Sequence, residues 1–265
     1  MGLGGFQVPD DGTQANVEQA LELGYRHVDT AAGYDNEDGV GAAPRSSGVP
    51  RDEFFVITTL RNGDQGYEPA LRAFDSSRRA LGLDVVDLYL IHWPVPSKDL
   101  YVETWRAFER LLDDGAVRAI GVSNFLPDHL DRLVSASQVV PAVNQIELHP
   151  TFQQADVQAA CRRHGVAVEA YSPLGRGADL EAPAVTEIAT ELGVTPAQVV
   201  LRWEVQQGLV VIPKSLSAQR QATNIDVFSF DLDDARMAAV EGLEAGVQGR
   251  TGADPETADF TRFRD

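Results

Sequence analysis

Residues 54–93 read FFVITTLRNGDQGYEPALRAFDSSRRALGLDVVDLYLIHW, and this stretch decides the fold. It begins and ends with apolar runs, over 54–60 and 86–93, that are rich in Val, Ile and Leu and alternate little. Such runs are typical of parallel strands that are covered on both faces. Between them, residues 69–81 have helical periodicity and are followed by Gly82, a residue that favours a helix C-terminus. The stretch therefore predicts one strand–helix–strand unit.

The same unit repeats along the whole chain without a linker or a break in composition. The predicted strands are 2–6, 27–31, 54–60, 86–93, 118–123, 143–148, 167–172 and 210–214. Further helices are expected at 13–23, 101–113 and 155–164, and two more begin near Pro127 and Pro196. Eight such units in about 230 residues indicate a (β/α)₈ TIM barrel. A doubly wound sheet is the weaker alternative, because no G-x-G-x-x-G follows the first strand.

We therefore expect a single domain over residues 1–265, with the barrel at about 2–232 and a C-terminal helix and tail at 233–265. The chain has 40 acidic and 22 basic residues and a net charge of −18, which argues against nucleic acid and anionic membranes as partners. The single cysteine, Cys161, excludes an intramolecular disulfide, and no metal site is predicted. Without a signal peptide or a long apolar run, we expect a cytoplasmic monomer.

Polar residues follow the apolar runs where the strands end, the edge at which TIM-barrel active sites lie. They are Asp29, Thr59, Arg61, His92, Ser123, Asn124, Gln145, Glu147, His149, Tyr171, Ser172, Lys214 and Ser215. Each of them alone has a simpler explanation as a cap, a turn residue or a satisfied core side chain. Together they predict a polar pocket.

Several strand motifs resemble those of the aldo-keto reductases. The second strand reads HVDTAA over 27–32, followed by Tyr34, Asn36 and Glu37, and the fourth reads LYLIHWP over 88–94. The fifth, sixth and eighth read IGVSNF over 120–125, VNQIELHP over 143–150 and IPKS over 212–215. The resemblance runs in order from about residue 2 to residue 232 and is closest to prokaryotic reductases of keto acids and keto sugars.

The resemblance implies an NADP(H)-dependent oxidoreductase that reduces the carbonyl of a small, possibly anionic, metabolite to an alcohol. Tyr34 would donate the proton, His92 would orient the carbonyl oxygen, and Asp29 would lie behind the tyrosine. A phenol with a pKa near 10 is a poor acid–base group at neutral pH unless a cation or hydrogen bonds favour its anion. In the family, a lysine at the end of the third strand supplies that cation.

The third strand departs from this pattern. Thr59 occupies the position of the family lysine, and Arg61 occupies the position of an aromatic residue. Three interpretations remain open: Arg61 replaces the lysine electrostatically, Arg61 binds an anionic substrate group, or the barrel binds NADP(H) or another ligand without reducing a carbonyl. The last would make it a lyase, isomerase, cyclase or non-catalytic binder. The only lysines are Lys98 and Lys214.

The cofactor-binding positions match the family better. The resemblance implies that they are Ser123, Asn124, Gln145, Tyr171, Ser172, Leu174, Lys214, Ser215, Arg220 and Asn224. Phe6, Tyr34, Trp93 and Arg61 would line the mouth of the substrate pocket. Pro44 is expected to shorten or kink the helix after Tyr34, since an interior proline costs a helix about 3 kcal/mol.

Overall fold

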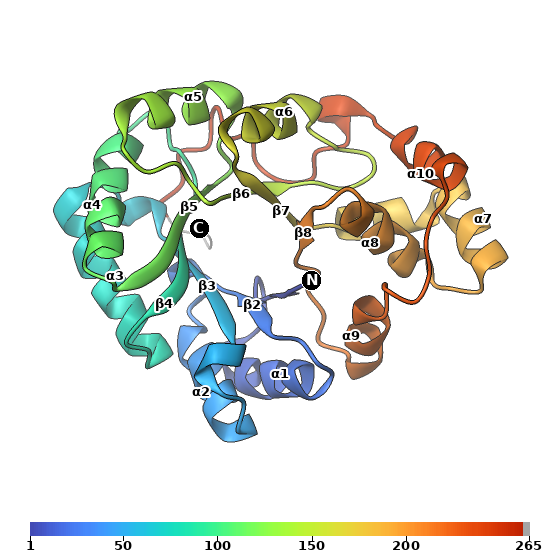
Figure 1. The fold of residues 1–265 in the computed structure, drawn as a ribbon, viewed down its shortest axis with the longest axis horizontal. Coiled ribbons are helices and arrows are strands. Elements are labelled where there is room, and N and C mark those ends of the chain that lie inside the picture. The colour runs from blue at the N-terminus through green and yellow to red at the C-terminus, as the bar shows by residue number, and fades with distance from the viewer. Residues whose placement is uncertain (262–265) are drawn as a thin grey trace.

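The structure is a computed structural model, and it describes residues 1–261. Within these residues, eight parallel strands form one sheet in the order β1 to β8, with helices around it (Figure 1). The strands are β1 (Leu3–Gly4), β2 (His27–Asp29), β3 (Phe55–Leu60), β4 (Val86–Ile91), β5 (Val117–Ser123), β6 (Val143–Glu147), β7 (Ala167–Tyr171) and β8 (Val210–Val211).

The helices lie outside the ring of strands. The α-helices are α1 (Asp10–Glu22), α2 (Glu37–Ser47), α3 (Tyr67–Leu81), α4 (Tyr101–Asp113), α5 (Pro127–Ala136), α6 (Ala155–His164), α7 (Pro183–Leu192), α8 (Pro196–Gln206), α9 (Ala218–Ile225) and α10 (Asp234–Glu241). Short 3₁₀ helices are η1 (Ala32–Tyr34), η2 (Arg51–Glu53), η3 (Asn62–Asp64), η4 (Gly175–Glu181) and η5 (Gly246–Gln248).

Two backbone hydrogen bonds close the barrel between its first and last strands. The amide of Gly2 donates to the carbonyl of Val211 at 2.8 Å, and the amide of Gly4 donates to the carbonyl of Pro213 at 3.3 Å. The predicted TIM barrel is therefore confirmed. Strand β8 is shorter than the predicted 210–214, because Pro213 has no amide hydrogen to continue the ladder.

Helix α3 shows how the sequence forms the outer layer. Its buried residues include Ala70, Phe74 and Leu81, which lie on one face and pack on the sheet. Gly82 ends the helix at a φ of +64°, a left-handed conformation that glycine adopts without steric cost. The main core lies between the sheet and these helices, and a smaller cluster of Ile57, Leu88 and Leu90 fills part of the barrel interior.

Pro44, which is predicted to shorten or kink the helix after Tyr34, does not end that helix. Helix α2 continues through Pro44 to Ser47 and is capped by Gly48, whose amide donates to the carbonyl of Pro44. Because Pro44 lies in the last turn, it removes only one intrahelical hydrogen bond and leaves the first turns, next to Tyr34, intact.

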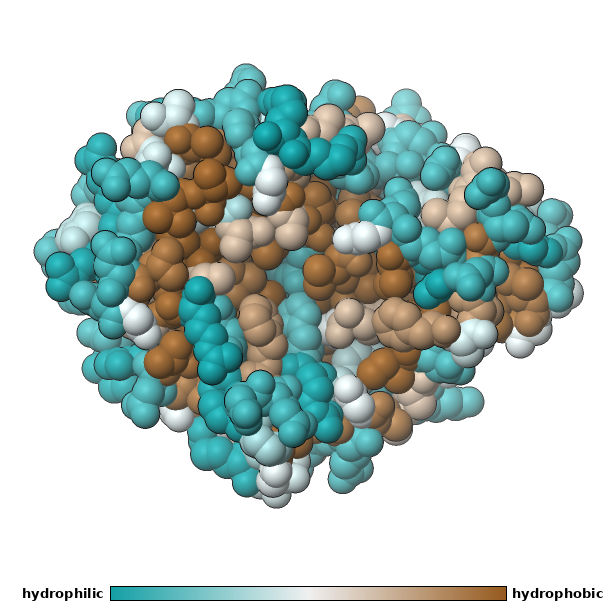
Figure 2. Space-filling view, in the orientation of Figure 1, coloured by the Kyte–Doolittle hydropathy of each residue, from teal (hydrophilic) through white to brown (hydrophobic). Residues whose placement is uncertain are grey.

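The chain after α10 forms a tail that contains η5 and returns to the barrel. The predicted tail ran to residue 265, and residues 262–265 lie outside the described part. No helix within residues 1–261 is long and apolar enough to cross a membrane. In the view of Figure 2, apolar residues gather around the centre of the face while hydrophilic residues dominate its outline.

Candidate active site

A cavity of about 410 Å³ lies at the carboxyl ends of the strands. Ten of the residues expected from the sequence line it: Phe6, Asp29, Tyr34, His92, Trp93, Asn124, Gln145, Tyr171, Ser172 and Lys214. They come from both halves of the barrel. The barrel thus brings the predicted acid–base residues and much of the predicted cofactor site to one cavity.

The turn that carries Tyr34 is fixed by buried polar contacts. The hydroxyl of Thr30, directly after β2, donates to Oδ1 of Asn36 at 2.7 Å. The side-chain Nδ2 of Asn36 donates to the carbonyl of Gly5, next to β1, at 3.1 Å. Because these bonds span the turn from both sides, Tyr34 has a defined position at the cavity wall.

Tyr34 and His92 are neighbours in the cavity. Their rings meet edge to face with centroids 5.8 Å apart, and the Phe6 ring lies 5.2 Å from that of Tyr34. Burial, the carboxyl of Asp29 and the phenol of Tyr171 raise the pKa of Tyr34 well above its ordinary value. Burial lowers the pKa of His92 to about 3, so its imidazole is neutral at physiological pH.

Thr59 is buried beside His92. Its hydroxyl lies 3.4 Å from Nδ1 of His92, with only 1% of the residue exposed. The side chain beside Nδ1 of His92 is therefore a neutral hydroxyl and not a cation. When Thr59 donates this hydrogen bond, the ring proton of the neutral His92 is on Nε2.

Asp29 belongs to a buried carboxyl pair that sequence reasoning missed. The side-chain Nε2 of Gln145 donates to Oδ2 of Asp29 at 2.8 Å and to Oε1 of Glu169 at 2.7 Å. His27 lies 3.4 Å from the other oxygen of Glu169. Burial and mutual repulsion raise the pKa of Asp29, and burial raises that of Glu169.

Those two carboxyl groups also fix the orientation of Gln145. Both are acceptors and require the NH₂ end of the amide, so the amide oxygen is the atom left for a ligand. The pair could be anticipated only from inward-facing positions of β2 and β7, because Glu169 follows no recognisable motif.

The structure corrects the expected place of Arg61. Nε of Arg61 donates to the carbonyl of Ala32 at 2.8 Å, and the guanidinium pairs with Asp35 at 2.5 Å. Its side chain is 43% exposed and lines a second cavity, of about 570 Å³, between α2 and α3. Arg61 lies one residue beyond the end of β3, where strand pairing no longer fixes the direction of a side chain.

The predicted cofactor-binding residues form a connected set of side-chain hydrogen bonds. The hydroxyl of Tyr171 donates to Oδ1 of Asn124 at 2.8 Å, and Nδ2 of Asn124 donates to the carbonyl of His92 at 3.0 Å. The hydroxyl of Ser123 donates to the carbonyl of Gln145 at 2.8 Å. Ser123 therefore braces the wall without lining the cavity, whereas Tyr171 and Asn124 line it.

The remaining cofactor positions lie around α9 and the β7–α7 connection. Lys214 lines the cavity after β8, and Ser217 caps α9 by accepting a hydrogen bond from the Arg220 amide. Ser215 is buried in the turn before α9, and Asn224 is buried on α9. Leu174 precedes η4 and packs on the core.

Other lining residues had no signal in the sequence. Arg176 enters from η4, and Gly252, Ala253 and Phe260 enter from the C-terminal tail. The Phe260 ring lies 5.3 Å from that of Trp93. A tail without strand or helix periodicity gives no indication of where it docks.

A sequence profile of the Aldo/keto reductase family matches residues 1–245 of the chain. The chain belongs to this family. It is 50% identical over 261 residues to an aldo-keto reductase of Mycolicibacterium smegmatis, covering 98% of this chain and 94% of the relative. It is 49% identical over 276 residues to the morphine 6-dehydrogenase of Pseudomonas putida, covering 99% and 93%.

A crystal structure of a Gox0644 mutant in complex with NADPH is a similar solved structure. It superposes with a TM-score of 0.93 at 48% identity, covering 98% of this chain and 94% of that one. Family membership explains why the strand-end motifs of this chain converge on one cavity.

Proposed function

We propose that this aldo/keto reductase uses NADP(H) to reduce the carbonyl of a small metabolite to an alcohol. The observation that carries the proposal is that one cavity holds both Tyr34 and the neutral His92 beside the amide groups of Asn124 and Gln145 and the ring of Tyr171. The relatives with reductase and dehydrogenase names, and the NADPH complex of Gox0644, support it.

The cavity residues fit a nicotinamide nucleotide. The side-chain amide oxygen of Gln145 can accept from a carboxamide, and the Tyr171 ring offers a flat surface for stacking. Lys214 and Arg220, near the N-terminus of α9, can hold a 2′-phosphate, because helix N-termini and cations both favour phosphate. When bound, the cofactor supplies the hydride that adds to the carbonyl carbon.

The acid–base step falls to Tyr34 and His92. His92 donates a hydrogen bond from Nε2 to the carbonyl oxygen, with Thr59 as the donor to Nδ1. Tyr34 transfers its phenolic proton to the same oxygen as charge develops on it, and the tyrosinate is reprotonated from solvent after the alcohol forms. Burial and the neighbouring Glu169 raise the pKa of Asp29, which disfavours a negative charge beside the tyrosinate.

The substrate side of the cavity is aromatic. Phe6, Trp93 and Phe260 line it, and Arg61 points elsewhere. These rings favour a carbonyl compound with an apolar part. An anionic substrate would depend on Arg176 or Lys214 rather than on Arg61.

A second candidate function, ligand binding or non-redox chemistry, is favoured by Thr59 and by the raised pKa of Tyr34. It predicts tight NADPH binding without cofactor oxidation.

NADPH consumption measured with aldehydes, keto acids and quinones separates the two functions. We expect turnover with at least one class, and Tyr34→Phe should lower kcat by about 10²-fold or more while NADPH affinity stays unchanged. Tyr67→Phe, at the start of α3 outside the cavity, is the matched control. Tight NADPH binding with no turnover across the panel would favour the second candidate.

A further inference from the structure

The C-terminal tail forms part of the cavity wall. Gly252, Ala253 and Phe260 line the cavity, and a Cβ added to Gly252 would lie 3.6 Å from the Tyr171 hydroxyl. The side-chain Nδ2 of Asn62, in η3, donates to the carbonyl of Phe260 at 2.9 Å. The tail and Tyr171 therefore line the same part of the cavity.

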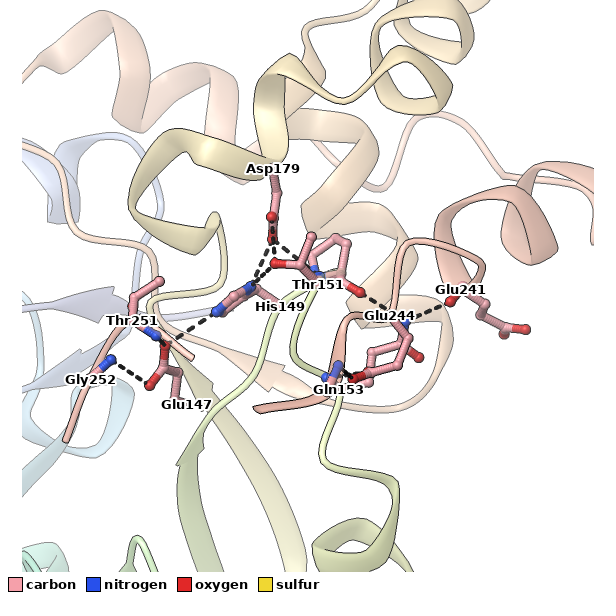
Figure 3. Close-up of polar contacts among 11 residues, drawn as sticks. Glu147, His149, Thr151, Gln153, Asp179, Glu241, Glu244, Thr251 and Gly252 are labelled. Carbon is pink, nitrogen blue, oxygen red and sulfur yellow. Dashed lines mark hydrogen bonds and ion pairs between the residues drawn. The ribbon is translucent and has the colours of Figure 1, made fainter. Parts of the chain in front are cut away.

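A single buried carboxylate, that of Glu147 at the end of β6, holds the tail at this point (Figure 3). It accepts hydrogen bonds from the Thr251 amide at 2.6 Å, the Thr251 hydroxyl at 2.6 Å and the Gly252 amide at 2.9 Å. Only 3% of Glu147 is exposed. Three donors from two consecutive residues make Glu147 the main anchor of this part of the tail.

His149 connects that carboxylate to a second one. Its Nε2 lies 3.2 Å from Oε1 of Glu147, and its Nδ1 lies 2.7 Å from Oδ2 of Asp179. Burial alone would lower the pKa of His149, but the two carboxylates outweigh it and raise that pKa to about 9. Both ring nitrogens therefore donate, and the imidazolium lies between two anions at neutral pH.

Asp179 brings a further element into the network. It lies in η4, the segment that carries Arg176 to the cavity, and it also accepts from the Thr151 hydroxyl at 2.8 Å. The carbonyl of Thr151 in turn accepts from the Ala245 amide, at the start of the tail, at 3.0 Å. The network thus ties the tail at two points to the segment that follows the proposed cofactor residues Tyr171 and Ser172.

We propose that Glu147, His149 and Asp179, which we call the latch, hold the tail over the cofactor half of the cavity and set the rate at which NADP(H) leaves. This inference rests on the proposed function. The latch residues are positioning residues, because within residues 1–261 they act on the cavity through the tail and η4. The sequence motif over 143–150, which contains Glu147 and His149, does not predict this role.

The tail can be displaced without substituting a latch residue. A Cβ at Gly249 would lie 2.0 Å from the Thr151 carbonyl oxygen, a backbone atom that cannot swing away. The helical φ of −77° at Gly249 suits alanine, so the clash is the only cost of Gly249→Ala. Gly242→Ala is the matched control, since its Cβ would lie at an ordinary 3.4 Å from the nearest atom.

The experiment measures two quantities on the full chain: amide hydrogen exchange at Thr251 and Gly252, and the NADPH dissociation rate by stopped-flow fluorescence. For Gly249→Ala and for Glu147→Gln, we expect faster exchange and a dissociation rate raised by at least about tenfold, since charge-assisted hydrogen bonds are lost. Gly242→Ala should change neither. If the latch only stabilised the fold, these substitutions would lower the free energy of unfolding and leave the NADPH dissociation rate unchanged.

Two results would overturn the inference: unchanged exchange in both variants, or faster exchange with an unchanged NADPH dissociation rate. Failure of the wild-type chain to bind NADPH would instead overturn the proposed function. In that case the exchange of the two amides still shows whether the latch holds the tail.

Discussion

Replacing Thr59 with lysine should accelerate carbonyl reduction. The Thr59 hydroxyl lies 3.4 Å from Nδ1 of His92, and the His92 and Tyr34 ring centroids are 5.8 Å apart. A four-carbon lysine stem that starts at this position can bring its ammonium to the phenol and to the Asp29 carboxyl. The new cation would lower the pKa of Asp29 and oppose the burial that now raises the pKa of Tyr34.

The size of the effect follows from Coulomb's law. A unit charge about 4 Å from the phenolate oxygen, at an effective dielectric constant of about 20, contributes about 4 kcal/mol. That energy equals a fall of about three pKa units for Tyr34. Since proton transfer is only partly advanced in the transition state, we expect kcat to rise by about 10- to 100-fold.

The assay is steady-state NADPH oxidation with the best carbonyl substrate, together with the pH dependence of kcat. Thr59→Met is the control, because methionine has a stem of similar length without charge. Thr59→Lys should exceed both Thr59→Met and wild type, and its pH profile should shift towards lower pH. If Thr59→Lys binds NADPH normally and is no faster than Thr59→Met, then the charge at this position does not limit the reaction and the reasoning is refuted.

Three further predictions concern the cofactor, the packing and the latch. Arg220→Ala should weaken NADPH binding by about 10- to 150-fold and leave NADH binding unchanged in fluorescence titrations, because one charge-assisted contact to the 2′-phosphate is lost. Gly41→Ala should lower the free energy of unfolding by about 1–3 kcal/mol in urea titrations, because its Cβ would lie 1.9 Å from the Leu81 carbonyl oxygen, whereas Gly12→Ala, with open space at its Cβ, should raise it. The pKa of His149 is raised from 6.5 to about 9, so the folded chain keeps a proton that the unfolded chain loses. The contribution of His149 to stability should be complete below pH 6.5 and fall as pH rises through 9, by at most about 1.4 kcal/mol per pH unit. His149→Gln should lack this component in unfolding titrations from pH 6 to 10, and equal pH slopes for the two proteins would contradict it.

The barrel could be predicted from the sequence because each of its units is local. The strand β3, the helix α3 and Gly82 each have a periodicity or a conformational preference that is visible within a few residues. Strand ends were less accurate. Strand β8 ends before Pro213, which has no amide hydrogen for the ladder, and the apolar run from which the strand was predicted continues past that point.

The Arg61 prediction fails for a related physical reason. Strand alternation gives the face of a side chain only while the chain remains in the ladder, and Arg61 lies one residue beyond Leu60, where β3 ends. There, nearby acceptors decide its direction. The Ala32 carbonyl and the Asp35 carboxylate are close, and a guanidinium with five donors binds both.

The residue at position 59 and the latch differ in how far a sequence alone can reveal them. The interpretation of Thr59 comes from a local motif, which can be compared position by position. The latch joins residues from β6, η4 and the tail, and only the fold brings Glu147 and Thr251, 104 positions apart, within 2.6 Å. The charge on His149 then depends on Asp179 and Glu147 being buried with it, and burial is a property of the assembled barrel. A sequence therefore reveals a changed catalytic position more readily than a positioning network, because the first departs from a local pattern and the second exists only in three dimensions.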